Sequence, residues 1–329
     1  MNKLQIFVLK SLRKLYQVIF GFEKSKKPDC IQDADLASNI ICKGLIDDKP
    51  CMIGRFGSNE LLCLVTYLGV KENKRNISSY ISGKSPEWWW NEQNFVNMNI
   101  VAGFFPPSTD KFIQFSKLML EDISQVDILG SWLQNEQVVQ NYLNSARKVH
   151  FRLLEPFWSD FPWTSALKGK KVLIVHPFAD TILNQYINRD KLFSNQLILP
   201  TFKSLNVIKA VQPLDANSFR FNDWFEALDY MKSEIDKQDY DVCLIGCGAY
   251  GFHLAAYVKR SGKKAVHLGG SLQLLFGIKG KRWEDPNYGV KEWGIPVGSY
   301  SNLMNEYWVR PGDIYKPKNA EEVEGACYW

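Results

Sequence analysis

The chain has 329 residues, enough to bury a substantial core in one large domain or two modest ones. Its net charge of +5 is spread along the chain without a long run of lysine or arginine, which argues against a nucleic-acid-binding protein. Aromatic residues make up 14 % of the chain, with 11 tryptophans, and indicate ring-lined surfaces for a flat ligand such as a sugar or a base.

The seven cysteines form no CxxC pair and mostly lie in apolar stretches. This usage is typical of small core residues in a reducing compartment, so we expect a cytoplasmic protein. The four histidines show no HExxH motif and no paired spacing with the cysteines, which argues against a structural zinc site.

Residues 1–28 form a separate segment, predicted to be a cationic amphipathic helix followed by a charged linker. At about 100° per residue, four basic side chains and Gln17 share one arc of this helix, and apolar side chains cover much of the rest. Because the basic residues interrupt the apolar sequence, we expect neither a transmembrane span nor a signal peptide. Two interpretations remain open: residues 3–20 lie on the inner face of an anionic membrane, or they pack on the protein's own core or on a second subunit.

Helices and strands up to residue 154 are predicted from caps, breakers and apolar runs. Ser85 and Pro86 are typical of a helix start, which places the tryptophans at 88–90 on a helix with at least one ring in a cleft or interface. Gly69 is expected to end the helix that follows the first strand. The predicted elements are helix 33–46 with Asp33 as its cap, strand 51–54, helix 58–68, helix 110–124, strand 126–129, helix 135–146 and strand 149–154.

From residue 171 onward, short apolar strands alternate with helices. This pattern predicts an α/β fold, with a Rossmann-like, mostly parallel sheet and helices on both faces. We expect the catalytic domain to cover residues 29–275, and an irregular Gly- and Trp-rich cover over 276–329 to complete the site. The predicted elements are strand 171–175, a helix from about 180, strand 205–211, helix 219–236, strand 241–245, helix 249–260 and strand 264–268.

Ligands of open parallel sheets bind beyond the carboxyl ends of the strands, so the residues after each predicted strand are candidates. The stretch "IGCGAYG" matches GxGxxG and places Gly246, Gly248 and Tyr250 at a phosphate-like ligand. Gly269 and Gly270 follow the last strand and would bring more backbone to the same ligand. An NADP-dependent oxidoreductase is one alternative, although that strand ends without the carboxylate that usually holds the ribose. Tight packing of helix on strand, without any ligand, is another.

The stretch "CMIGRFGSNELL" places an arginine at the end of a buried strand. Arg55 needs an anionic partner there, and a diphosphate fits the fork of its guanidinium. Glu60, in the first turn of the following helix, could hold a divalent cation against that diphosphate or take a proton from an acceptor hydroxyl. The local alternative is that Ser58 caps this helix and Glu60 complements its dipole, with no further role.

These residues resemble a known family. "RFGSNE" resembles the R-F/Y-G-D-G-E element of the GT-D fold glycosyltransferases, and "CLIGCGAYGFHLAAYVKRSGKKAVHLGG" is similar to a second segment of that family. The resemblance implies a bacterial glycosyltransferase with a nucleotide-sugar donor held at Arg55, Gly57, Ser58 and Asn59, and with Glu60 as the catalytic residue. It also implies a Mg²⁺ or Mn²⁺ ion at Glu60, but Ser58 stands in place of the family's first acid.

The family's acidic residues just beyond the last strand are replaced here by "GGSLQLLFG". A catalytic base from elsewhere is therefore an alternative, and Glu284 or Asp285 in "KRWEDPNYG" is the next choice. Lys281 and Arg282 could neutralise a leaving diphosphate, and Trp283 could stack on a base or sugar. Otherwise this stretch is a solvated basic turn.

His176, at the end of strand 171–175, could contact the donor or serve as a hydrogen-bonded structural residue. The combined expectation is an enzyme that moves a sugar from a nucleotide diphosphate to a hydroxyl of a bacterial surface glycan or lipid-linked oligosaccharide. A non-catalytic assembly protein that binds nucleotide sugars is a further alternative, because of the acid missing at Ser58.

Overall fold

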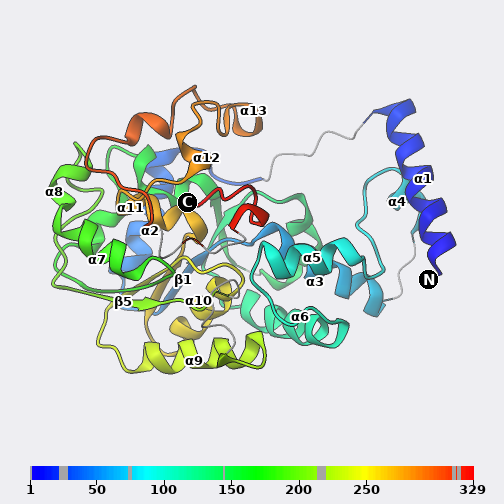
Figure 1. Cartoon of the computed structure of the whole chain (residues 1–329), viewed down its shortest axis with the longest axis horizontal. Helices are drawn as coiled ribbons and strands as arrows, with labels where there is room; N and C mark the ends of the chain where they lie inside the picture. Colours follow the sequence, from blue (N-terminus) through cyan, green and yellow to red (C-terminus); the bar gives the residue numbers. More distant parts are fainter. Residues whose placement is uncertain are drawn as a thin grey trace.

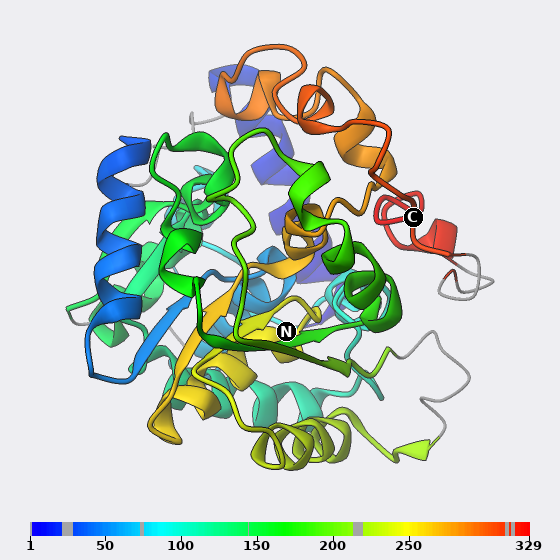
Figure 2. The same cartoon turned by 90° about the vertical axis from the view of Figure 1, so that its left-hand side faces the viewer.

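The computed structural model describes residues 2–21, 29–72, 76–143, 145–212, 220–312, 316 and 320–329. Within them, seven strands form one sheet in the order β3-β2-β1-β7-β6-β4-β5 (Figures 1 and 2). All neighbouring strands are parallel, which confirms the predicted α/β fold with a Rossmann-like sheet. The strands are β1 (Cys51–Gly54), β2 (Ile128–Ser131), β3 (Arg147–His150), β4 (Lys171–His176), β5 (Ser204–Lys209), β6 (Val242–Ile245) and β7 (Lys264–His267).

The central strands are buried on both sides, because successive side chains of a strand point to opposite faces. Met52 of β1 belongs to the core on one face, whereas its neighbours Cys51 and Ile53 belong to the core on the other. Helices cover both faces, as predicted. The first face carries α3 (Ser58–Glu72), α5 (Glu92–Ile100), α6 (Thr109–Ile123), α9 (Trp224–Asp236) and α10 (Tyr250–Arg260), and the second carries α2 (Ala34–Ile46), α7 (Ala179–Ile187), α8 (Arg189–Leu192) and α11 (Leu272–Leu275).

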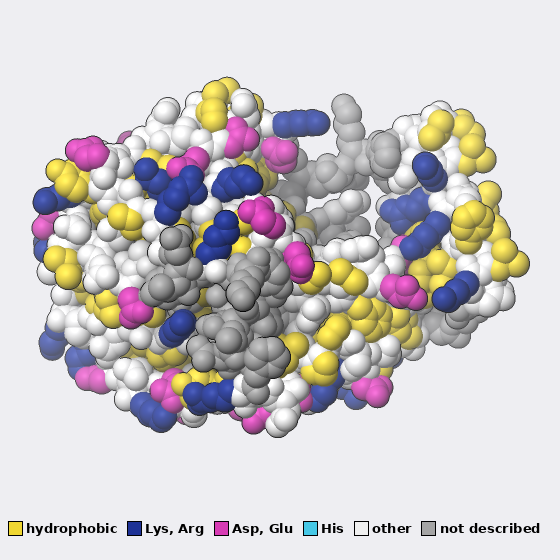
Figure 3. Space-filling model, in the orientation of Figure 1, with side chains coloured by type: hydrophobic (Ala, Val, Ile, Leu, Met, Phe, Trp, Pro, Cys, Tyr) yellow, Lys and Arg dark blue, Asp and Glu magenta, His cyan; other side chains and the backbone are white. Residues whose placement is uncertain are grey.

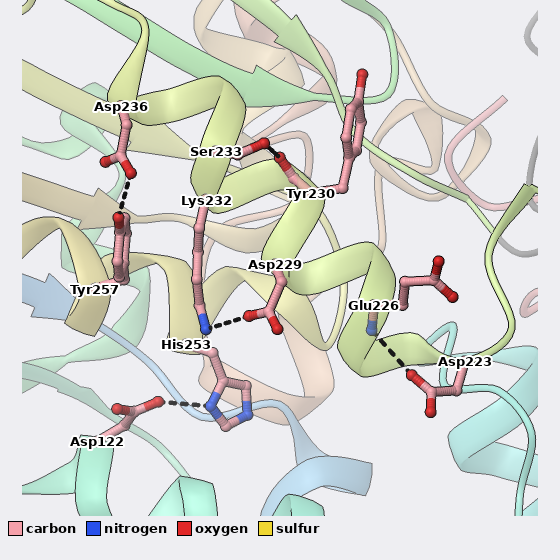
Figure 4. A network of polar contacts seen from close by, with 10 residues as sticks. All are labelled: Asp122, Asp223, Glu226, Asp229, Tyr230, Lys232, Ser233, Asp236, His253 and Tyr257. Carbon is pink, nitrogen blue, oxygen red and sulfur yellow. Dashed lines mark hydrogen bonds and ion pairs between the residues drawn. The ribbon is translucent and has the colours of Figure 1, made fainter.

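Polar contacts join the helices of the first face (Figure 4). His253 Nδ1 of α10 lies 2.7 Å from Asp122 Oδ2 of α6, and both side chains are almost fully buried. Arg260, at the end of α10, pairs with the other oxygen of Asp122 at 2.6 Å. Tyr257 of α10 donates to Asp236 of α9 at 2.6 Å. These contacts hold α10 against α6 and α9, and so fix the helix that begins at the end of β6.

The prediction that the tryptophans at 88–90 lie on a helix is wrong. They belong to an irregular segment, and Trp88 and Trp89 pack edge-on against Tyr80, with ring centroids 5.4 and 5.0 Å away. We call these three residues the Tyr80 cluster. Gly69 does not end α3, which continues to Glu72. A side chain at position 69 would press on the backbone of Trp88. This glycine therefore allows the segment around Trp88 to pack closely on α3, and it does not mark the end of the helix.

Further boundaries differ from the predictions. The predicted helix 135–146 is a 3₁₀ helix over Gln134–Tyr142, and residue 144 lies outside the described residues. In place of the predicted strand 149–154, β3 covers Arg147–His150, and Phe151–Leu154 forms a second 3₁₀ helix. Helix α9 begins at Trp224, where Asp223 accepts a hydrogen bond from the Glu226 N–H at 2.9 Å, and the predicted start at residue 219 is not among the described residues.

Helix α1 (Lys3–Phe20) lies at one end of the molecule beside α4 (Ile77–Ile81) (Figure 1). Ile6 and Leu9 pack on the Tyr80 cluster, and Arg13 lies over the ring of Tyr80, 4.7 Å from its centroid. Lys10 also faces the body, where it pairs with a glutamate at 3.5 Å. The predicted linker, residues 22–28, lies outside the described residues. None of the described helices is long and apolar enough to cross a membrane.

The segment after residue 276 is irregular, as predicted. It contains the short helices α12 (Lys281–Glu284) and α13 (Val290–Trp293) and, within the described residues, no strand longer than an isolated bridge between Ile278 and Val309. The end of the chain returns toward the sheet, where Gln273 of α11 donates to the carbonyl oxygen of Tyr328 at 3.1 Å. The C-terminal residues therefore cover the carboxyl end of the sheet (Figure 1).

Candidate functional site

A cavity of about 220 Å³ opens beyond the carboxyl ends of four adjacent strands, β1, β7, β6 and β4. Strands β4 and β6 are neighbours in the sheet, but the strand that follows β4 in the chain, β5, and the strand that follows β6, β7, lie on opposite sides of this pair. Such a reversal of strand order is where open α/β sheets bind their ligands. The structure brings together here most of the residues predicted from separate motifs. They are Arg55, Gly57, Ser58, Asn59, Glu60, His176, Gly246, Gly248, Tyr250, Gly269, Gly270 and Arg282.

Arg55 follows β1 directly and lies in the wall of this cavity, which we call the main cavity. Its Nε donates to the carbonyl oxygen of Leu268 at 3.3 Å, and its guanidinium rests over Gly269. Gly269 has a φ of +65°, and a Cβ there would collide with the guanidinium. The ion pairs found among the described residues do not include Arg55. Its outer nitrogens are therefore held in place but not neutralised by a carboxylate.

Glu60 lies in the first turn of α3 and also lines the main cavity. Its carboxylate folds back over Gly57, where a Cβ would collide with it. Burial raises the pKa of the Glu60 carboxyl, and its own backbone N–H and the charge of Arg55 oppose that rise only in part. Ser58 is exposed at the mouth of the cavity. Glu60 is thus a carboxyl group with a raised pKa beside a guanidinium that forms no ion pair with any described residue.

The turn after β6 brings backbone close to the cavity. A side chain on Gly246 would meet the carbonyl oxygen of Gly269 and the ring of His176, and Gly248 has a φ of +58°. Helix α10 begins two residues later, so the positive end of its dipole points toward the cavity. Gly251, the third glycine of the motif, packs on the ring of His267. Close packing on His267 therefore accounts for a glycine at position 251, whereas Gly246 and Gly248 also line the main cavity.

Two buried histidines line the same cavity. Burial lowers the pKa of His176 to about 3, and its Nδ1 accepts a hydrogen bond from the Phe178 N–H at 3.0 Å, so the neutral ring carries its proton on Nε2. Burial, helped by the charge of Arg55, lowers the pKa of His267 to about 3. Both rings are therefore neutral at physiological pH. Sequence reasoning missed His267, although its place at the end of β7 was a usable signal.

The C-terminal segment closes one side of the main cavity through Arg282, Glu324 and Tyr328. Arg282 forms an ion pair with Glu324 and lies over the ring of Tyr328, 4.5 Å from its centroid. Tyr328 in turn packs on Gly270, where a Cβ would collide with it. Sequence reasoning missed Glu324 and Tyr328, because only the return of the chain brings them to the site.

Four of the predicted residues do not line the main cavity. Glu284 pairs with Arg310 on the surface, and Asp285 is exposed and accepts from the Asn287 N–H at 2.9 Å. Neither residue lines the main cavity, so a catalytic base at these positions stays a prediction. Trp283 is buried and lines a second, smaller cavity. The exposed Lys281 donates to the carbonyl oxygen of Gly325 at 3.2 Å.

A divalent cation fits the residues of the main cavity poorly. Among the described residues, no group of three or more His, Cys, Asp or Glu side chains is placed to hold a metal. Glu60 has a raised pKa, Ser58 offers a hydroxyl where the related motif has an acid, and Glu324 is already paired with Arg282. Bound phosphates would have to supply most of the ligands of a Mg²⁺ or Mn²⁺ ion here.

Comparison of the chain with protein-family models, with curated proteins and with solved structures gave no match.

Proposed function

We propose that this protein is a glycosyltransferase that moves a sugar from a nucleotide diphosphate donor to a hydroxyl of a bacterial glycan or lipid-linked oligosaccharide. The observation that carries the proposal is the unpaired Arg55, held over Gly269 in a cavity walled by glycine turns. A fixed guanidinium beside exposed backbone and a helix N-terminus is the arrangement that binds a diphosphate. The resemblance of "RFGSNE" to the GT-D motif supports the same assignment.

The proposed reaction is a single displacement at the anomeric carbon. The acceptor hydroxyl attacks that carbon, the bond from the carbon to the diphosphate oxygen breaks, and the hydroxyl proton passes to the carboxylate of Glu60. Arg55 and Arg282 offset the charge that grows on the leaving diphosphate, together with the N-terminus of α10. The raised pKa of Glu60 suits a general base, because it brings the proton affinity of the carboxylate closer to that of the acceptor hydroxyl.

A dinucleotide-binding oxidoreductase is the second candidate, favoured by the turn from Gly246 to Gly251. In that case NADPH, and not a nucleotide sugar, should bind at the turn. The strand β7 that follows ends in His267 and a glycine pair, without a carboxylate for the ribose. A non-catalytic protein that binds nucleotide sugars would occupy the same cavity without turnover.

A thermal-shift screen distinguishes these candidates. We expect UDP, GDP, CMP or one of their sugar conjugates to raise the melting temperature, because a ligand that binds only the folded state stabilises it. Donor hydrolysis, measured in parallel, separates an enzyme from a binding protein. A rise with NADPH and none with any of the nucleotides would contradict the proposal.

Arg55→Ala tests the diphosphate site directly. Loss of a charge-assisted contact should weaken nucleoside diphosphate binding roughly tenfold to a hundredfold, as measured by calorimetry. Arg189→Ala is the matched control, since Arg189 pairs with Asp190 at 3.4 Å and does not line the main cavity. Equal affinity in both variants would remove Arg55 from the site.

Glu60→Gln tests the proposed base. Transfer should fall roughly 10²- to 10⁴-fold while nucleotide binding persists, because glutamine cannot accept the proton. In the wild type, transfer should also decline as pH falls through the raised pKa of Glu60, since only the ionised carboxylate acts as a base. Near-normal transfer by Glu60→Gln would return Glu60 to a structural role at the start of α3.

A further inference from the structure

A second cavity of about 90 Å³ adjoins the main cavity. The two cavities are neighbours, because they share Arg55, Trp132, Gly270, Arg282 and Tyr328 as walls. Among the residues that line only the second cavity, Trp283 alone was predicted to stack on a base or sugar. The others come from three separate segments, 151–155, 268–271 and 288–300.

Aromatic rings form a continuous wall around this second cavity. The ring of Phe151 stacks on Trp132 with centroids 5.0 Å apart and meets Trp293 edge-on at 5.2 Å. Trp293 contacts Tyr288 at 5.2 Å, and Tyr288 contacts Tyr300 at 5.4 Å. Such a wall offers flat apolar faces of the kind that pack on the C–H face of a pyranose.

One carboxylate interrupts the apolar wall. Glu155 is more than nine-tenths buried, and its Oε2 accepts hydrogen bonds from Tyr300 at 2.8 Å and from the Trp158 indole N–H at 3.0 Å. Neither bond uses Oε1. Burial raises the pKa of Glu155, while hydrogen bonds from Tyr300, Trp158 and Ser271 and the charge of Arg152 favour the ionised form. Each carboxylate oxygen can accept more than one hydrogen bond, so Oε1 can also accept from a sugar hydroxyl.

We propose that the second cavity holds the sugar ring of the donor, with Glu155 accepting from one of its hydroxyls and the ring of Trp293 packed on its face. This inference rests on the proposed function. It places the anomeric carbon where the two cavities meet, between Arg55 and Arg282 on the diphosphate side and the aromatic wall on the sugar side. The ligand class is a hexose attached to a nucleoside diphosphate.

Calorimetry with paired ligands tests the inference. UDP and GDP are compared with UDP-glucose, UDP-galactose, UDP-N-acetylglucosamine and GDP-mannose, and the wild type should bind one conjugate more tightly than the matching diphosphate. Glu155→Gln keeps the size of the side chain and should reduce affinity for that conjugate roughly tenfold to a hundredfold. Affinity for the diphosphate alone should change less than twofold. Trp293→Leu should give the same pattern and serves if Glu155→Gln fails to fold.

Two results have opposite meanings. If both variants lose diphosphate and conjugate affinity together, or keep the preference for the conjugate, the sugar does not lie in the second cavity. If the wild type binds none of the diphosphates, the proposed function itself fails.

A separate observation concerns α1. Its outward side is apolar: Leu4, Val8, Leu12, Leu15 and Ile19 are each more than 40 % exposed. At about 100° per residue, these side chains together with the exposed Phe7 and Val18 span an arc of roughly 140°, interrupted only by a serine. Figure 3 shows this apolar edge facing away from the body, at the end of the molecule. So large an exposed apolar stripe marks an interaction surface.

Charge identifies the partner of this stripe. The helix carries four basic residues and no acidic one. Lys3 and Lys14 are exposed along one border of the stripe, while Lys10 and Arg13 are engaged with the body. Two copies of α1 facing each other would bring like charges together, whereas an anionic lipid surface attracts them. We infer that α1 docks on an anionic membrane through this stripe, independently of what the main cavity binds.

Co-sedimentation with vesicles tests this second inference. The full chain should pellet with vesicles of phosphatidylcholine and phosphatidylglycerol and much less with phosphatidylcholine alone. Leu15→Glu should reduce binding at least tenfold, and Lys14→Glu about fivefold with a weaker dependence on salt. Ile187→Glu, which changes an exposed apolar residue on α7, should bind as the wild type does. No binding to the anionic vesicles, or a dimer in light scattering that Leu15→Glu dissociates, would overturn the inference.

Discussion

His176 and His267 should make the stability of this protein fall steeply in mild acid. Both side chains are buried, and burial lowers the pKa of each to about 3 in the folded state. In the unfolded chain the imidazole pKa is about 6.5. Between these two values the unfolded state binds more protons than the folded state, so the free energy of unfolding decreases as pH falls from about 6.5 toward about 3.

The magnitude follows from the two pKa values. At pH 4 an unfolded imidazole is almost fully protonated and a folded one almost entirely neutral, so each histidine should cost about 3 kcal/mol relative to pH 8. Since the net stability of a domain is about 5–15 kcal/mol, two such sites can unfold the protein before most carboxylates are protonated. The effect is fully absent above pH 7.5, where both states hold the neutral ring.

Urea unfolding between pH 4 and pH 8 measures the effect, and His176→Asn isolates one of the two sites. The amide oxygen of asparagine can still accept from the Phe178 N–H, which donates to His176 Nδ1 at 3.0 Å in the wild type. The variant should be less stable at pH 8 because a ring is lost, yet its loss of stability down to pH 4 should be smaller by about 3 kcal/mol. Parallel pH dependences for the wild type and the variant would refute the assignment of His176 as a buried neutral ring.

Two further substitutions probe the supports of the site. Gly269→Ala forces a Cβ into the Arg55 guanidinium and strains a φ of +65°, so we expect weaker binding of UDP or GDP in calorimetry, and unchanged affinity would contradict the proposed contact. Asp122→Ala removes the partner of both His253 and Arg260 and should lower the free energy of unfolding by about 3–5 kcal/mol in urea titrations. A loss below about 1 kcal/mol would mean that this buried network contributes little.

The sheet was predictable because its signal is local. Runs such as "KVLIV" and "DVCLI" are apolar throughout, and that pattern belongs to strands covered on both faces. Arg55, Glu60 and Gly246 could be assigned to one cavity without coordinates, since the carboxyl ends of parallel strands share an edge. The cap at Asp33 was equally local, and its carboxylate accepts from the Leu36 N–H at 2.7 Å.

What the sequence could not predict depends on tertiary packing. Trp88 and Trp89 lie in an irregular segment and not on the predicted helix. Their rings are buried there against Tyr80 and against Ile6 and Leu9 of α1. Glu155 lies between two 3₁₀ helices after β3, and Tyr328 reaches the cavities only because the C-terminal cover folds back over the sheet. Glu284 resembled a catalytic residue in the sequence, but Arg310 holds it on the surface.

The balance of charge in the main cavity bears on the proposed function, because Ser58 stands where the motif that it resembles has an acid. Two guanidinium groups, Arg55 and Arg282, line the cavity with two carboxylates. Glu324 is paired with Arg282, and the raised pKa of Glu60 makes its ionised form less favourable. Arg55 forms no ion pair among the described residues, so it remains available to an anionic ligand. An acid at position 58 would weaken the attraction of the cavity for an anion unless a bound cation offset its charge. A serine at this position is therefore consistent with a diphosphate held by protein cations and backbone N–H groups.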